Sequence, residues 1–523
     1  MARTYGDAVA ALNTLQTNAA AIDAAAKADP ANSVRLMPEM IQWCRWAGYE
    51  PADFDNFRPI HIAGTKGKGS TSAFISSILA QYTPSPSQPK PLFNKIGLYT
   101  SPHLRFVRER IRINNEPLPE ELFAKYFWET WDKLEESARA QGKPTDKTAK
   151  PSYFRFLTLM AFHTYIREKV DTAIIECGIG GEYDCTNVIP NPSVTGITSL
   201  GIDHVQLLGN TIEEIAWHKA GIMKEGAPAY TVPQPPAAQD VLDSRAVEKS
   251  VHLSTVQNNP LLQNIQLGLS APFQHSNASL AIVLAAKLLQ SLSYPLPSLF
   301  PSNLPPEFIR GLEQVRWPGR CEVRRETGIA WHLDSAHTLE SIHLAASWFA
   351  SEALPPSPSS PPQPQQDILQ PPPPSPTDNT KTPPRILLFN QQTRDASSLA
   401  RALFSTLSTT LSTPHPFTHA VFCTNLTFKE SGYRPDLISI NTDQAKVQAL
   451  GVQRGLRDAW RELDGECVVE VKGSIEEAVG WVRGIAGTEG GGGKGGGRGE
   501  EVKCLVTGSL HLVGGFLEVF EGG

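Results

Sequence analysis

A glycine- and lysine-rich octapeptide has the residue types and spacing with the clearest chemistry: Gly64-Thr65-Lys66-Gly67-Lys68-Gly69-Ser70-Thr71. Glycines let backbone N–H groups converge on phosphate oxygens, and a lysine neutralises charge on the β- and γ-phosphates. In the usual phosphate loop Lys is followed directly by Ser or Thr, whereas here a glycine separates them. An ordinary strand-to-helix turn needs neither three glycines nor two lysines. The sequence therefore predicts a phosphate-binding loop.

A carboxylate marks a second candidate position. Glu176 ends an apolar, strand-like run and is followed by Cys177-Gly178-Ile179-Gly180-Gly181. Open α/β sheets bind ligands at the carboxyl ends of their strands, and Mg²⁺ is usually held by one or two carboxylates, waters and substrate phosphates. We therefore predict Glu176 as a Mg²⁺ ligand. Taken alone, its position fits a helix cap or an ion pair equally well.

Four further polar motifs become candidates for a nucleotide or metal site once a phosphate loop is predicted in the same chain. Asp203-His204 follows a strand pattern, and His218-Lys219 lies on a helical pattern. Trp317-Pro318-Gly319-Arg320 stands where a second domain would begin, and Asp334-Ser335-Ala336-His337 follows a strand in that domain. An arginine at a domain junction can reach a γ-phosphate, and an aspartate after a strand can accept a ribose hydroxyl. Each has an ordinary alternative: a solvated helix face, an interface ion pair or a helix cap.

These residues require strands and helices that alternate along the chain. Strand-like runs at 58–63, 170–176 and 193–199 and a helical pattern at 70–82 predict βαβ units around a mostly parallel sheet. The pattern resumes after Trp317, with strands expected at 329–333, 385–389, 420–423, 467–471 and 502–506. We predict an α/β fold with the phosphate loop in a first domain at 1–317 and a second α/β domain at 318–523.

Unusual composition is confined to short segments. Between Leu354 and Pro384, 13 of 31 residues are proline, which favours solvated polyproline II and predicts a disordered insertion. A smaller proline-rich loop is expected at 83–91, and residues 487–499 contain nine glycines, which predicts a flexible loop. Both kinds of segment lie between the motifs.

Charge and cysteine content exclude several classes. The net charge of -6 provides no positive field for nucleic acid, and the apolar runs are too short for a transmembrane helix. Seven scattered cysteines without a CxxC pair argue against a disulfide framework and a zinc site. Residues 1–31 resemble neither a secretory signal nor a good transit peptide. We expect a cytoplasmic protein, with the mitochondrial matrix or inner-membrane surface as a second location.

Eight blocks in order, within about residues 40 to 345, resemble the folylpolyglutamate synthases, a family of the ATP-dependent Mur ligase superfamily. The first block, His61–Ser70, contains the phosphate loop. The other seven are Tyr99–Leu104 with Arg108–Asn114, Glu176–Gly181 with Tyr183–Asn187, Gly201–His204 through Leu207–Gly209, His218–Ile222, Gln274–Ala278, Trp317–Arg320 and Leu333–Thr338. Eight ordered blocks are far more specific than any one of them.

The resemblance implies a P-loop ATPase domain, a C-terminal Rossmann-like domain and ATP bound between them. It implies catalytic roles for Lys68, His204, Lys219 and Arg320. It implies a magnesium site at Ser101, Glu176, His204 and a carbamylated Lys219, with K⁺ or another monovalent cation as a further candidate. It implies nucleotide contacts from Gly64, Thr65, Lys66, Gly67, Lys68, Gly69, Ser70, Gln274, Asn277, Arg320, Asp334 and His337. The family usually has glycine where Ser335 stands, so a left-handed backbone there would strain this chain.

The implied activity is ATP-dependent addition of L-glutamate to the γ-carboxylate of folates through an acyl phosphate. The expected partners are folate, L-glutamate and ATP, with a monomeric enzyme and no nucleic acid or integral membrane segment. The nearest alternative is a dihydrofolate synthase, alone or bifunctional, which joins glutamate to dihydropteroate with the same machinery. A catalytically idle scaffold that docks partners through its proline-rich insertion, and a small-molecule kinase, are the alternatives from other classes.

Overall fold

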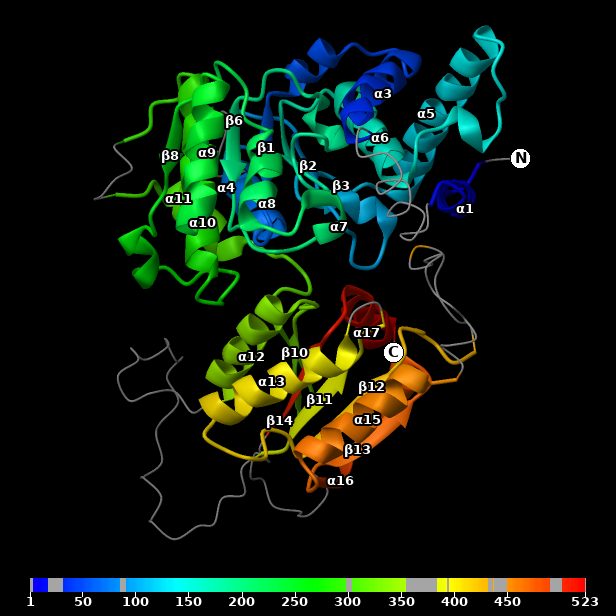
Figure 1. The fold of residues 1–523 in the computed structure, drawn as a ribbon, viewed down its shortest axis with the longest axis vertical. Coiled ribbons are helices and arrows are strands. Elements are labelled where there is room, and N and C mark those ends of the chain that lie inside the picture. The colour runs from blue at the N-terminus through cyan, green and yellow to red at the C-terminus, as the bar shows by residue number, and fades with distance from the viewer. Residues whose placement is uncertain are drawn as a thin grey trace. The chain divides into compact units, whose positions relative to one another are not determined.

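The computed structural model describes residues 3–16, 32–84, 91–297, 303–353, 383–392, 395–430, 436, 449–489 and 501–522. The chain divides into two compact units, of which the first contains Met1–Pro318 and Arg434–Thr442 and the second the remainder from Gly319 (Figure 1). The division falls one residue after the expected boundary at 317. Asp436, expected in the second domain, groups with the first, where its carboxylate accepts a 2.9 Å hydrogen bond from the backbone N–H of Val107.

The first unit is built on an eight-stranded sheet with the order β4-β3-β2-β5-β1-β6-β7-β8. In this order, every neighbouring pair from β2 across to β8 at the edge is parallel. The β2–β3 and β3–β4 pairs at the other edge are antiparallel. The strands are β1 (Pro59–Ala63), β2 (Ile96–Tyr99), β3 (Ile111–Ile113), β4 (Glu116–Pro117), β5 (Thr172–Glu176), β6 (Val194–Ile197), β7 (Ala229–Thr231) and β8 (Leu253–Thr255).

Helices cover both faces of this sheet (Figure 1). The described helices of this unit are α1 (Tyr5–Asn13), α3 (Asn32–Trp46), α4 (Lys68–Ala80), α5 (Glu120–Ala140), α6 (Tyr153–Arg167), α7 (Val205–Leu208), α8 (Ile212–Ala220), α9 (Pro236–Glu248), α10 (Gln274–Ser291) and α11 (Pro306–Gln314). Short 3₁₀ turns lie at Pro51–Phe57, Val107–Arg110, Lys147–Ala149, Cys185–Val188 and Pro260–Asn264.

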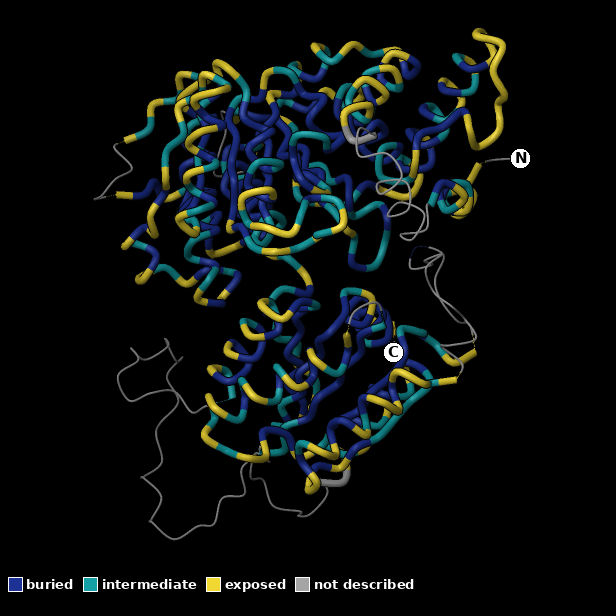
Figure 2. Tube along the Cα trace, in the orientation of Figure 1, coloured by how far each residue is buried: buried dark blue, intermediate teal, exposed yellow. Residues whose placement is uncertain are grey.

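The alternation of buried side chains along β5 explains the two-sided core. Ala173 and Ile175 pack in one apolar cluster with α5 and α6, whereas Ile174 packs in another with α4, α10 and α11. A strand covered on both faces can be apolar at every position, as β1 and β5 nearly are. The darkest, most buried tube in Figure 2 therefore runs through the central strands.

The second unit has a six-stranded sheet with the order β13-β12-β11-β14-β10-β9, parallel except for the edge strand β9. Its elements are β9 (Glu322–Glu326), β10 (Ile329–Leu333), α12 (Leu339–Ala353), β11 (Arg385–Phe389), α13 (Ala396–Thr410), β12 (His419–Cys423), α15 (Gly451–Leu463), β13 (Val468–Lys472), α16 (Ile475–Glu489), β14 (Val502–Thr507) and α17 (Leu510–Gly522).

The expected α/β class with mostly parallel sheets is confirmed, and each predicted strand is present within two residues of its predicted ends. The proline-rich stretch 354–382 and most of the 83–91 and 487–499 segments lie outside the described residues. All seven cysteines have free, buried thiols. Among the described helices, none has the length and apolar character needed to cross a bilayer.

Candidate functional site

The phosphate loop occupies the turn from β1 to α4, and its backbone requires glycine at two positions. Gly64 has φ +146° and Gly67 has φ +91°, both left-handed. A Cβ at Gly64 would lie 1.8 Å from the Thr198 hydroxyl oxygen, and one at Gly67 would lie 2.2 Å from Asn277 Oδ1. The loop therefore approaches its neighbours too closely for a side chain, and it leaves the first N–H groups of α4 available to an anion.

Side chains from α10 line the same loop. Gln274 Nε2 donates to Ser70 Oγ at 3.4 Å, and Asn277 Nδ2 donates to Gln274 Oε1 at 2.8 Å. Lys68 Nζ donates to the Gly64 carbonyl at 3.1 Å, so this lysine curls back over the loop. The structure thus brings together predicted nucleotide residues that are about 200 positions apart in sequence.

The first half of the loop is bonded to the segment after β6. The N–H groups of Thr65 and Lys66 both donate to the Ser199 carbonyl, at 2.9 and 3.1 Å. Thr65 Oγ1 donates to the Gly201 carbonyl at 3.1 Å, and Lys66 Nζ forms an ion pair with Asp203 Oδ2 at 3.0 Å. We expected the Lys66 ammonium to bind a phosphate of the nucleotide, but in the structure it binds the Asp203 carboxylate.

Glu176 ends β5 beside β1 and faces the phosphate loop. Its Oε2 accepts a 3.0 Å hydrogen bond from the Ser101 N–H, and a Cβ built on Gly69 would lie 3.7 Å from that oxygen. A carboxylate beside a phosphate site suits Mg²⁺, which commonly completes its shell with phosphate and water. Among the described residues, no three or more His, Cys, Asp or Glu side chains form a metal cluster by themselves.

Lys219 lies in the last turn of α8, close to the loop of residues 178–181. A Cβ on Gly181 would lie 2.5 Å from the His218 carbonyl oxygen, so the loop packs directly on the helix backbone. Burial, followed by the positive charge of Lys68, lowers the pKa of Lys219 to about 7. A large fraction of this amine is therefore neutral, and nucleophilic, near neutral pH.

His204 is exposed and directly precedes α7 with left-handed backbone angles, φ 53° and ψ 40°. Its N–H donates to the Oδ1 of the neighbouring Asp203 at 2.9 Å. Glu176 is thus the last residue of β5, and Ser101 and His204 lie in the segments that follow β2 and β6. Lys219 packs against the loop that follows β5.

The predicted nucleotide residues of the second unit follow its own strand end. Asp334 comes after β10, where it is buried and accepts hydrogen bonds from the N–H groups of Cys321 and Ala336, both at 2.9 Å. Burial raises the pKa of its carboxyl. Ser335 is not in the left-handed region, and its hydroxyl donates to the Gly319 carbonyl at 3.1 Å. Serine therefore causes no backbone strain at this position.

Two other predicted residues stand close by in that unit. Arg320 makes a 3.4 Å contact with the Gly319 carbonyl, and His337 Nδ1 lies 2.9 Å from the Ser335 carbonyl oxygen. Nothing in these local contacts tests their nucleotide roles, which stay predictions.

A buried polar network beneath Glu176 was not foreseen as a unit. His61 Nε2 lies 2.8 Å from Thr186 Oγ1 and 3.1 Å from Cys177 Sγ, and Thr186 donates to Asp184 at 2.6 Å. Asp184 also accepts from the Ile179 N–H at 2.9 Å, which fixes the 178–181 loop. Burial lowers the pKa of His61 to about 3, so this imidazole is neutral. The signal available in the sequence was a histidine inside an otherwise apolar strand.

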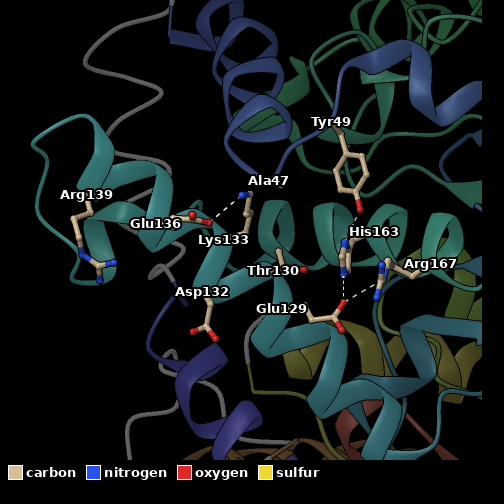
Figure 3. Close-up of a pocket in the computed structure, with 10 residues that line it drawn as sticks. All are labelled: Ala47, Tyr49, Glu129, Thr130, Asp132, Lys133, Glu136, Arg139, His163 and Arg167. Carbon is tan, nitrogen blue, oxygen red and sulfur yellow. Dashed lines mark hydrogen bonds and ion pairs between the residues drawn. The ribbon is translucent and has the colours of Figure 1, made fainter.

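A cavity of about 660 Å³ lies elsewhere, between α3, α5 and α6 (Figure 3). Several of its ionisable groups are engaged with one another: His163 Nε2 lies 2.8 Å from Glu129, and Tyr49 OH lies 2.6 Å from His163 Nδ1. Arg167 lies 3.4 Å from the same Glu129 carboxylate. None of the predicted site residues lines this cavity.

Comparisons with known proteins agree with this arrangement, although no family model matches the chain. The folylpolyglutamate synthase of Neurospora crassa is 43% identical over 523 residues, covering 99% of this chain and 92% of that protein. That of Saccharomyces cerevisiae strain FostersO is 42% identical, covering 99% and 87%.

Solved structures match the fold. The Mycobacterium tuberculosis folylpolyglutamate synthase complexed with ADP and AMPPCP has a TM-score of 0.66 at 22% identity, covering 93% of this chain and 95% of that one. An FPGS–AMPPCP–folate complex has a TM-score of 0.62 at 21% identity, covering 99% and 100%. With relatives above 40% identity along nearly its whole length, this chain belongs to the folylpolyglutamate synthase family.

Proposed function

We propose that this chain is an ATP-dependent ligase that adds L-glutamate to the terminal γ-carboxylate of tetrahydrofolate and of folylpolyglutamates. One observation carries the proposal: a glycine-constrained phosphate loop, a facing carboxylate and a lysine of lowered pKa meet at the strand ends of the first unit. Membership of the family, whose solved relatives bind ADP, AMPPCP and folate, supports the substrates.

The chemistry of amide formation sets the order of steps. A carboxylate is a poor electrophile with a poor leaving group, so the γ-phosphoryl group of ATP is first transferred to the folate γ-carboxylate. This transfer gives ADP and an acyl phosphate. The amine of L-glutamate then attacks the acyl carbon, phosphate leaves, and the attacking nitrogen loses a proton. The first N–H groups of α4 and the Lys68 ammonium hold the charge that develops on the phosphoryl oxygens.

The proposed metal set is Ser101, Glu176 and His204, and the bound Mg²⁺ would supply charge neutralisation at the transferring phosphoryl group. The 3.0 Å bond from the Ser101 N–H to Glu176 keeps that carboxylate beside the phosphate loop before any substrate arrives. Because Glu176 is buried, the cation and its phosphate ligands compensate a charge that would otherwise be costly.

Lys219 is proposed to act as a carbamate. Its neutral amine adds CO₂ to form an N–C bond and loses one proton, which converts a potential positive charge into a negative one. The positive charge of Lys68 contributes to the lowered pKa of the Lys219 amine, and the same charge would attract a negative carbamate at Lys219. The new anion supports the cation site.

From the second unit we propose that Arg320 binds the nucleotide phosphates, and that Asp334 and His337 hold ribose and adenine. Each Asp334 oxygen accepts from the protein backbone and has further lone pairs, so a ribose hydroxyl can donate to it as well.

The test is a substrate comparison. Purified protein receives Mg-ATP and L-[¹⁴C]glutamate with either tetrahydrofolate monoglutamate or dihydropteroate, in buffers with and without K⁺. We expect label in the tetrahydrofolate product, at a rate that reveals any need for K⁺. Label entering only with dihydropteroate would replace the proposal by a dihydrofolate synthase, and no label with either substrate would contradict ligase activity.

A further inference from the structure

An ion pair connects the phosphate loop to the segment that carries His204. Lys66 Nζ lies 3.0 Å from Asp203 Oδ2, and the two side chains are 22% and 9% exposed. Partial burial on both sides makes this contact more persistent than a surface pair, which is screened and weak.

The ion pair lies at one end of a row of hydrogen bonds, the seam, that joins the phosphate loop to residues 199–203. Ser199 accepts from the Thr65 and Lys66 N–H groups, and Gly201 and the Thr65 hydroxyl bond to each other in both directions at 3.1 Å. The backbone of the loop's first half is therefore fixed along 199–203 by bonds that do not involve a ligand. The Lys66 ammonium is the end of this seam.

The other oxygen of Asp203 acts on His204. Oδ1 accepts the His204 N–H at 2.9 Å, and His204 has φ 53°, a region that costs a non-glycine residue free energy and persists only where neighbours impose it. The Lys66 ammonium holds one carboxylate oxygen while the other holds the strained backbone of the next residue. The direction of the exposed imidazole depends on that backbone.

We propose that Lys66 is a positioning residue for the cation site: through Asp203 it fixes the left-handed turn that presents His204, and it does not act as a phosphate ligand. In this arrangement the two loop lysines divide their work. Lys68 serves the phosphates, and Lys66 sets the metal ligand. The inference rests on the proposed metal role of His204.

The experiment separates metal binding from nucleotide binding. Affinity for Mn²⁺ alone is measured by the EPR signal of the free ion, and affinity for a fluorescent ADP analogue is measured in EDTA. The variants are Lys66→Met, Asp203→Asn, the double variant, Lys66→Arg and, as the phosphate control, Lys68→Met. Near-UV circular dichroism and the thermal midpoint check each fold, and isosteric Asp203→Asn tests the same contact if Lys66→Met is unstable.

We expect Lys66→Met and Asp203→Asn each to weaken Mn²⁺ binding by roughly 10-fold, the lower end for partners that orient a metal ligand. The double variant should be no weaker than either single one, Lys66→Arg should restore most of the affinity, and ADP binding in EDTA should change by less than about 2-fold. Lys68→Met should instead lose ADP affinity.

Three results would overturn the inference: loss of metal-free ADP affinity in Lys66→Met equal to that in Lys68→Met, additive losses in the double variant, or unchanged Mn²⁺ affinity in Asp203→Asn. His204→Ala separates the two proposals. If it keeps wild-type Mn²⁺ affinity, the metal site of the proposed function is wrong; if it loses Mn²⁺ while Lys66→Met does not, only the positioning role fails.

Discussion

Two polar regions of the first unit differ in how their charges are balanced. In the cavity between α3, α5 and α6, His163, Glu129, Arg167 and Tyr49 neutralise or hydrogen-bond one another. At the strand ends, burial and a neighbouring lysine leave Lys219 with a pKa of about 7, and two glycines leave no room for side chains.

The difference teaches that a hollow is weaker evidence of function than a buried ionisable group with a shifted pKa. Groups that satisfy each other have little left to offer a substrate, whereas a lysine of lowered pKa is poised to react or to bind a ligand. Variants in the two regions test this difference, beginning with those for which the largest effect is expected.

Removing the charges that act on the phosphoryl group should have the greatest effect. Lys68→Ala and Glu176→Ala should each lower kcat by about 100- to 1000-fold, the size expected for a lost transition-state electrostatic contact. Turnover of labelled glutamate measures the loss, and circular dichroism checks the fold. Near-normal turnover in either variant would remove that residue from the mechanism.

Lys219 should show carbamate chemistry that follows its pKa. With ¹³CO₂, a carbamate carbon resonance should grow as pH rises through about 7, because the neutral amine is the form that reacts. Lys219→Met should lack the resonance and lose about 100-fold in kcat. A resonance that persists in Lys219→Met would assign the carbamate to another lysine.

The lowered pKa of Lys219 also sets the direction in which the unfolding free energy changes with pH. The folded-state pKa of Lys219 lies below the unfolded value of 10.5, so the unfolded chain binds more protons between about pH 7 and 10.5. Through this group, unfolding free energy should rise with pH across that window, and it should be lowest below pH 7. In urea titrations across that window, the unfolding free energy of wild type should rise more steeply with pH than that of Lys219→Met, because only the contribution of this lysine is lost.

Close packing at the phosphate loop should make Gly67→Ala more damaging than a matched change. Gly67 and Gly142 both have positive φ, +91° and +66°, but only Gly67 has neighbours within 4 Å of a built Cβ. Both alanines carry a backbone penalty of about 1 kcal/mol. Gly67→Ala should in addition lower nucleotide affinity at least 10-fold, and Gly142→Ala should leave it unchanged. Equal nucleotide affinities in the two variants would contradict the steric account.

The smallest effect is expected in the cavity. His163→Phe and Glu129→Gln should change kcat/KM for folate, glutamate and ATP by less than about 2-fold, with at most a modest fall in thermal midpoint. A selective rise in one KM would show that the cavity binds that substrate, and the contrast between the two regions would fail.

Strand ends could be predicted from sequence because their signals are local. Arg385–Phe389 and Ile329–Leu333 were located to the residue by short, mostly apolar runs, and the phosphate loop by its glycines. Six of the described strands were not predicted: β2, β3, β4, β7, β8 and β9. The first five are only two to four residues long, and β9 is charged and half-exposed.

Contacts between distant segments could not be predicted from sequence. Nothing local says that Lys66 pairs with a carboxylate 137 residues away, or that Asp184 fixes the loop beside Lys219. The composition of the loop favoured phosphate for both lysines equally. Only the packing of the 199–203 segment on the loop distinguishes them.

The acyl phosphate is the central claim, and isotope transfer tests it most directly. Folate monoglutamate labelled with ¹⁸O in its γ-carboxylate is converted with Mg-ATP and L-glutamate, and the released phosphate is analysed by mass spectrometry. The account predicts one ¹⁸O atom in each phosphate, because a carboxylate oxygen bonds to phosphorus and leaves with it. Phosphate without ¹⁸O, accompanied by product formation, would contradict it.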